Sequence, residues 1–258
     1  MEQQQKVLTA LTFVFSLIAI VFTVVSLGTD NWVESTPRLI QNGTERDSYS
    51  KFNFGLFKGH RDINYGNGAR SSELSVVCEP SHGVCVVYGN SGQEALTAED
   101  YIAEKMSNRT DEALYKLGLV NYGLWVTPII CAAVSMVFGF ISMGFAVFNI
   151  CGKPIETITG PMGLYLWNGI AFIFALLDMI VYLALFLSTW KKNFLLQSDI
   201  DKFSIEDYTD PGYSFYLVPG AVVLYMMNII LLICSGYKFR CSFRSEAEKV
   251  VDNGVILY

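Results

Sequence analysis

Four long runs of apolar residues dominate the pattern of hydrophobic and polar positions along the chain. The runs are Val7–Thr29, Leu117–Gly152, Thr157–Trp190 and Pro211–Tyr237. Together they contain one charged residue, Asp178. A helix that crosses a bilayer needs roughly 20 consecutive apolar residues with few charges. Because a backbone in lipid must satisfy its own hydrogen bonds, we expect each run to form a helical span. The expected spans are 7–28, 121–148, 161–189 and 213–236.

These spans divide the rest of the chain into five segments. The segments are an N-terminus at 1–6, a long loop at 29–120, a turn at 149–160, a short loop at 190–212 and a tail at 237–258. The N-terminus, turn and tail carry six Lys and Arg residues, against three in the short loop. Cytosolic segments next to spans are enriched in these cations, so we expect both termini in the cytosol. The protein is then a multi-pass protein of the plasma membrane.

Two other features bear on this topology. Ser26-x-Gly28 resembles a signal-peptide cleavage site, but the apolar run before it is longer than in a signal peptide, which favours a retained span. The acidic residues of the short loop lack the ligand spacing of a calcium-binding loop. We interpret the short loop as a solvated segment.

The long loop has the marks of an extracellular segment. Asn42-Gly-Thr and Asn108-Arg-Thr are acceptor motifs for N-glycosylation. Cys78 and Cys85 flank Pro80–Gly83, whose composition predicts a turn between two β-prone runs. A disulfide between these cysteines would close the hairpin in an oxidising compartment, and two free thiols are the alternative.

The composition excludes two classes of function. Charged residues make up 16% of the chain, whereas soluble domains carry about 25%. A net charge of −6 without a basic stripe argues against nucleic-acid binding. The two histidines, His60 and His82, have no nucleophile or metal-ligand cluster near them in the sequence. The sequence therefore predicts a protein that is not an enzyme and has no metal or cofactor.

Polar residues within the spans leave two interpretations open. Asp178 shares the third span with Asn168, and shares a helix face with Tyr182 four residues away. Such residues indicate either an ion or proton path or hydrogen bonds between helices. The second is favoured because the spans hold no other charge to pair with Asp178. In the second span, Ser135-x-x-x-Gly139 permits close approach of a helix, from the same chain or from a partner of unknown stoichiometry.

The cytosolic segments contain candidate modification and binding sites. Cys151 and Cys241 lie beside the membrane face and are either palmitoylated or unmodified. The chain ends in Ile256, Leu257 and Tyr258. This apolar end fits a PDZ-type groove, the alternative being a plain disordered end. The expected partners are the lipid bilayer, PDZ-type or actin-linked adaptor proteins, and other membrane proteins.

Several segments resemble the clarin family. Gly152–Asn168 is similar to the clarin signature between the second and third spans. Its motif positions are Gly152, Lys153, Pro154, Gly160, Pro161, Gly163 and Tyr165. Ile141–Asn149, Gly55–Gly59, Tyr213–Phe215 and Gly254–Tyr258 are similar too. The resemblance implies a non-enzymatic tetraspan glycoprotein of sensory hair cells, with roles in hearing, the hair bundle and its stereocilia, actin organisation, mechanotransduction and synapses.

A looser resemblance links the long loop to the claudins, which carry a Trp, then Gly-Leu-Trp, then two cysteines. The corresponding residues are Trp32, Gly55, Leu56, Phe57, Cys78 and Cys85, with Phe57 in place of the second Trp. This implies an all-α, claudin-like four-helix transmembrane bundle with a small extracellular β-sheet or hairpin in the first loop. The leading hypothesis is a membrane scaffold linked to cortical actin. The alternatives are a channel subunit that uses Asp178 and claudin-type cell adhesion.

Overall fold

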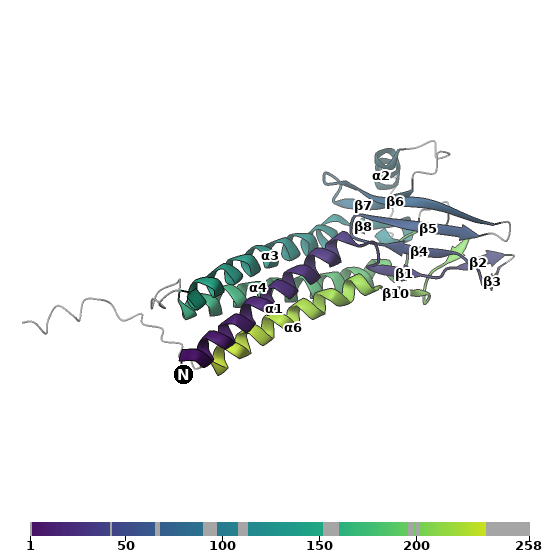
Figure 1. Cartoon of the computed structure of the whole chain (residues 1–258). Coiled ribbons are helices and arrows are strands. Elements are labelled where there is room, and N and C mark those ends of the chain that lie inside the picture. The colour runs from purple at the N-terminus through teal and green to yellow at the C-terminus, as the bar shows by residue number, and fades with distance from the viewer. Residues whose placement is uncertain are drawn as a thin grey trace, which may run out of the picture.

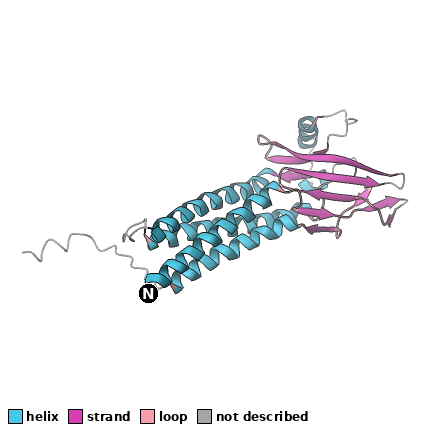
Figure 2. Ribbon diagram, in the orientation of Figure 1, coloured by secondary structure: helices cyan, strands magenta, loops and turns pink. Residues whose placement is uncertain are grey.

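A computed structural model describes residues 2–41, 43–64, 68–89, 97–107, 113–151, 160–195, 199 and 202–235. Within these residues, long helices lie side by side at one end of the molecule and the strands gather at the other (Figures 1 and 2). The N-terminus lies at the end of the helices that is far from the strands (Figure 1).

The helical part is a bundle formed by the apolar runs. Its helices are α1 (Glu2–Gly28), α3 (Tyr122–Cys151), α4 (Pro161–Leu185) and α6 (Tyr213–Cys234). A short π-helix, η2 (Phe186–Trp190), extends α4. Each helix contacts two others, in the cyclic order α1, α3, α4, α6. In the described part of the chain, these four helices are long and apolar enough to cross a membrane, which fits a tetraspan protein.

The interior of the bundle contains many small and polar side chains. On α1, where Ile20 is also buried, the buried small and polar residues follow one another at alternating steps of three and four residues: Thr9, Thr12, Ser16, Ala19, Thr23 and Ser26. The large apolar residues of the same helix, such as Val14, Leu17 and Val21, face outward. This period is that of helices that supercoil around each other. An apolar exterior around a small-residue interior suits helices in lipid and would be unfavourable in water.

One polar layer joins all the helices of the bundle. The Nδ2 of Asn228 on α6 donates to the Oγ of Ser16 on α1 at 2.9 Å and to the Oδ1 of Asn168 on α4 at 3.0 Å. The Nδ2 of Asn168 donates in turn to the Oγ of Ser142 on α3 at 2.6 Å. All four side chains are buried. The layer fixes the axial register of the helices, because a shift of any helix would leave polar groups without partners.

The described strands form a main sheet of seven strands, in the order β10-β1-β4-β5-β6-β7-β8, with every neighbouring pair antiparallel. The strands are β1 (Val33–Ser35), β4 (Lys51–Phe54), β5 (Lys58–Asn64), β6 (Ala69–Glu79), β7 (Val84–Gly89), β8 (Leu119–Asn121) and β10 (Thr209–Pro211). A small sheet, β3-β2-β9, consists of β2 (Arg38–Gln41), β3 (Thr44–Arg46) and β9 (Phe203–Ser204).

The main sheet corrects the sequence-based fold class in two respects. The protein is not all-α, and its sheet is not a small hairpin confined to the first loop. Strand β10 comes from the second loop, at 209–211, and pairs with β1. Strand β8 immediately precedes α3. These strands have three residues each, too few to show a period of two, and they pair because the helices bring distant segments together.

The two faces of the main sheet have different surroundings. One face packs on a core that includes Phe52, Phe54 and Leu74 from the strands, and Trp190 and Phe194 from the segment after α4. The other face is covered over β7 and β8 by α2 (Ala98–Ser107), through Ile102 and Ala98. The short 3-10 helix η1 (Leu114–Leu117) follows α2 and leads into β8. The first core is continuous with the top of the bundle and therefore positions the sheet on it.

We expect Asn228→Leu to destabilise the bundle. The leucine keeps the branch at Cγ but removes the donor that serves Ser16 and Asn168. The expected loss of unfolding free energy is about 1–2 kcal/mol. The measurement is the midpoint of thermal unfolding of the purified protein in detergent. Val223→Ala, on the outward face of the same helix, is the control and should shift the midpoint less. Equal shifts would contradict a register-fixing role for the layer.

Candidate functional site

The junction between the bundle and the main sheet is built around Trp32, which lies just before β1. Its indole Nε1 donates to the carbonyl oxygen of Ser26 on α1 at 2.7 Å. Its own carbonyl oxygen accepts the hydroxyl of Tyr182 on α4 at 2.8 Å. The Trp32 ring lies edge-on to Tyr182, with centroids 4.4 Å apart, and 6.5 Å from Phe215 on α6. The buried side chain therefore contacts three helices of the bundle.

The backbone of Trp32 ties the same point to the sheet. Its amide donates to the carbonyl of Phe54 on β4 at 2.9 Å, and its carbonyl also accepts the amide of Gly212 at 2.9 Å. A Cβ atom on Gly212 would lie 2.1 Å from the carbonyl oxygen of Asn31, so only glycine permits this approach. Backbone hydrogen bonds at Trp32 therefore hold together segments that are far apart in the sequence, namely β4 and the start of α6.

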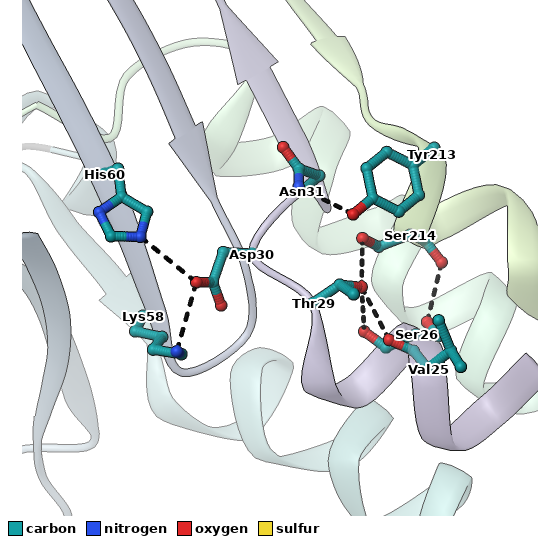
Figure 3. A network of polar contacts seen from close by, with 9 residues as sticks. All are labelled: Val25, Ser26, Thr29, Asp30, Asn31, Lys58, His60, Tyr213 and Ser214. Atoms are coloured by element: carbon teal, nitrogen blue, oxygen red, sulfur yellow. Dashed lines mark hydrogen bonds and ion pairs between the residues drawn. The ribbon is translucent and has the colours of Figure 1, made fainter.

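A polar network closes the ends of α1 and α6 beside Trp32 (Figure 3). The hydroxyl of Thr29 lies 2.7 Å from that of Ser214, and the hydroxyl of Ser26 donates to the carbonyl of Ser214 at 2.8 Å. The Nδ2 of Asn31 donates to the hydroxyl of Tyr213 at 3.1 Å. These bonds satisfy groups at the helix termini and hold the start of α6 against the end of α1.

Asp30 connects this network to the outer face of the sheet (Figure 3). Its Oδ2 lies 3.5 Å from the Nζ of Lys58 and 3.6 Å from the Nε2 of His60. Both basic side chains are more than half exposed, and such exposed pairs contribute about 0–1 kcal/mol each. His60 is part of an ion-pair cluster on the sheet surface and has no role in the buried junction.

The claudin-like residues meet at the same junction. Gly55–Phe57 forms the tip of the β4–β5 hairpin, which the indole of Trp125 on α3 holds by donating to the carbonyl of Leu56 at 2.8 Å. Leu56 and Trp32 belong to one buried core, whereas the Phe57 ring is 47% exposed and lies 6.3 Å from the Trp125 ring. The resemblance thus marks residues that dock the sheet onto the bundle.

A buried ion pair fastens the second loop to the inner face of the sheet. The Nη1 of Arg61 on β5 donates to the Oδ2 of Asp199 at 2.5 Å, and its Nε donates to the hydroxyl of Ser72 at 2.7 Å. Arg61 and Asp199 are 7% and 6% exposed. The interpretation of the second loop as solvated is therefore wrong at Asp199. The sequence gives no local signal for a pair separated by 138 residues.

Cys78 and Cys85 are joined by a disulfide in the structure. They lie directly opposite each other on β6 and β7, and the turn between these strands contains Gly83 with a φ of +66°. The positive φ favours glycine at this position. The disulfide closes the hairpin next to the part of the sheet that α2 covers.

The polar residues expected within the spans have different surroundings. Asn168 belongs to the polar layer, and Tyr182 bonds to Trp32. Asp178 is 2% exposed, and its Oδ1 has no hydrogen-bond partner among the described residues. Ser135 donates to the carbonyl of Ala171 on α4 at 3.0 Å. A Cβ on Gly139 would lie 2.3 Å from the hydroxyl of Tyr225, so the small-residue motif packs against helices of the same chain.

The family motif lies at the other end of the bundle and is only partly described. Gly160 is the N-cap of α4, which begins at Pro161, and its carbonyl accepts the amide of Gly163 at 3.0 Å. Tyr165 lies in the first turns of α4, and the exposed Cys151 ends α3. The remaining candidate residues lie outside the described part of the chain: Asn42, Asn108, Gly152, Lys153, Pro154, Cys241, Ile256, Leu257 and Tyr258.

We expect Asp199→Ala to destabilise the part of the protein that contains the main sheet strongly, because it leaves the buried charge of Arg61 without this carboxylate. The loss of a partner from a buried pair costs about 3–5 kcal/mol. The double variant Arg61→Met with Asp199→Leu should recover most of this loss, since it removes both charges. Lys58→Ala, which breaks an exposed pair, is the control. The midpoint of thermal unfolding would be measured for all three variants. A double variant whose midpoint is no higher than that of Asp199→Ala would refute the ion-pair explanation.

Comparisons with known proteins identify clarins as similar sequences. The family described as Clarin-2-like matches residues 114–232. Human clarin-1 is 24% identical over 96% of this chain and 95% of its own length. Human clarin-3 is 23% identical over 90% of this chain and 88% of its own length, and rat clarin-3 is 27% identical over 84% and 81%. The family match covers slightly less than half of the chain, and the relatives cover most of it at low identity, so the chain is similar to the clarins along most of its length.

Proposed function

We propose that the protein is a non-enzymatic tetraspan scaffold that organises a patch of the plasma membrane. The observation that carries this proposal is the junction at Trp32, which couples the main sheet to three helices through buried bonds. A platform fixed in this way presents a constant surface to partners on one side of the membrane. In this proposal, the apolar C-terminal residues bind adaptor proteins on the other side.

The orientation is supported by features at opposite ends of the bundle. The disulfide and both glycosylation motifs belong to the loop that carries the sheet. Disulfides persist in oxidising compartments, which favours an extracellular sheet. The N-terminus lies at the far end of the bundle (Figure 1), where the sequence places most of its membrane-flanking Lys and Arg residues. Both termini are then cytosolic.

The cellular role follows from the family. We propose that the scaffold links the membrane to cortical actin through PDZ-type or actin-linked adaptors. As the clarin resemblance implies, this link would serve mechanotransduction, hair-bundle maintenance and synapse organisation in sensory hair cells. The support for this role is the likeness to the clarins together with the apolar tail, which ends in Ile256, Leu257 and Tyr258.

The tail provides the test of this link. Proximity labelling from the full chain should mark actin-linked or PDZ-containing adaptors, and deletion of residues 255–258 should abolish that labelling. The glycans at Asn42 and Asn108, detected by their removal with a glycosidase, would control for orientation and surface delivery in both forms. Identical labelling from both forms would contradict the adaptor link.

A channel subunit is the second candidate function. It is favoured by one observation, the buried carboxylate of Asp178, whose Oδ1 has no hydrogen-bond partner among the residues described. Ionisable residues inside membrane helices mark ion or proton pathways when they do not simply join helices.

The channel function predicts that Asp178→Leu abolishes a membrane current while the amount of protein at the cell surface is unchanged. Leu177→Ala, at the neighbouring outward-facing position, is the control and should leave the current intact. Whole-cell recording with surface biotinylation would measure both. A current that survives Asp178→Leu, or no current from the native chain, would leave the scaffold as the function.

A further inference from the structure

The tip of the β4–β5 hairpin carries an exposed apolar side chain. Phe57 is 47% exposed, between the buried Leu56 and the charged Lys58. Single exposed apolar residues are common on protein surfaces, so the meaning of Phe57 depends on its neighbours. The neighbouring basic side chains of this sheet face, Lys58 and His60, lie beside Asp30 (Figure 3).

The hairpin tip is held at the level where the bundle begins. Trp125, in the second turn of α3, binds the carbonyl of Leu56 through its indole N–H at 2.8 Å. The Phe57 ring meets the Trp125 ring edge-on, with centroids 6.3 Å apart, and the Tyr122 ring lies 6.4 Å from that of Trp125. At the first turn of α6, Tyr213 and Tyr216 are also more than half exposed. Aromatic side chains therefore mark this level on two helices.

The surface changes character in a fixed order across this level. Ile130, roughly 7 Å further along α3, is 54% exposed and belongs to the apolar exterior of the bundle. The aromatic rings of Trp125 and Phe57 lie toward the sheet end of the same helix. A bilayer likewise presents acyl chains and then an interface that favours aromatic residues.

We propose that Phe57 and Trp125 form a phospholipid-contact site in which the hairpin tip dips into the outer leaflet beside the bundle. The occupant is the boundary between acyl chains and headgroups of a phospholipid. The site rests on the proposed insertion of the helices in the membrane. It adds a second anchor that sets the height of the main sheet above the bilayer.

The site is tested by photocrosslinking of the full chain in vesicles of palmitoyl-oleoyl phosphatidylcholine. Benzoylphenylalanine replaces one residue at a time: Phe57, Ile130 or Tyr49. Ile130 faces outward within the bundle, and Tyr49, 89% exposed, precedes β4 at the end of that strand opposite to the hairpin tip. Mass spectrometry then detects a phosphatidylcholine adduct. Comparison of reduced and non-reduced samples confirms that the Cys78–Cys85 hairpin has formed in each variant.

The proposal predicts a lipid adduct at position 57 comparable to that at position 130, with none at position 49. An adduct at position 130 without one at position 57 would overturn the contact site and leave membrane insertion intact. No adduct at position 130 would overturn the membrane insertion itself. An adduct of position 57 with a second protein chain would also overturn the site, since it would identify the hairpin tip as a protein interface.

Discussion

The burial of Trp32 is the interaction on which the rest of the structure depends. Its side chain bonds to α1 and packs against α4 and α6, while its amide and carbonyl bond to β4 and to the start of α6. These bonds lie in one small region, so the indole cannot leave without exposing the core that the bundle and sheet share. The orientation of the sheet on the helices is therefore decided by one residue and the partners that enclose it.

Trp32 also marks a change in the forces that stabilise the chain. On the bundle side of Trp32, the helices contact one another through small residues and through the polar layer. The layer consists of Ser16, Ser142, Asn168 and Asn228. Between helices in lipid there is little hydrophobic driving force, so close packing and hydrogen bonds must select the register. On the sheet side of Trp32, the core consists of large aromatic and aliphatic side chains, as in a soluble domain. The aromatic residues at the junction contact both the helix bundle and the core under the sheet.

The parts of the fold that depend on local pattern were predictable. A long apolar run without charges requires a helix whatever its neighbours are, and the β6–β7 hairpin lies within one stretch of sequence around Pro80–Gly83. The main sheet was underestimated because β8 and β10 have three residues each and pair across loops. The Arg61–Asp199 pair was missed for the same reason, since its partners meet only when the second loop folds onto the sheet. Trp32, Leu56 and Phe57 were identified by their resemblance to claudin residues. Their role in docking the sheet onto the bundle is visible only from their contacts in the structure.

The connections between strands and helices bear on what the sheet can transmit. Strand β8 ends at Asn121 and α3 begins at Tyr122, while Gly212 alone separates β10 from α6. With no free linker at either edge, a displacement of the sheet must move α3 and α6 or break the bonds at Trp32. A flexible adhesion module would need a hinge at these points. The direct connections favour a sheet that acts as one mechanical unit with the bundle, which is the property that a membrane scaffold requires.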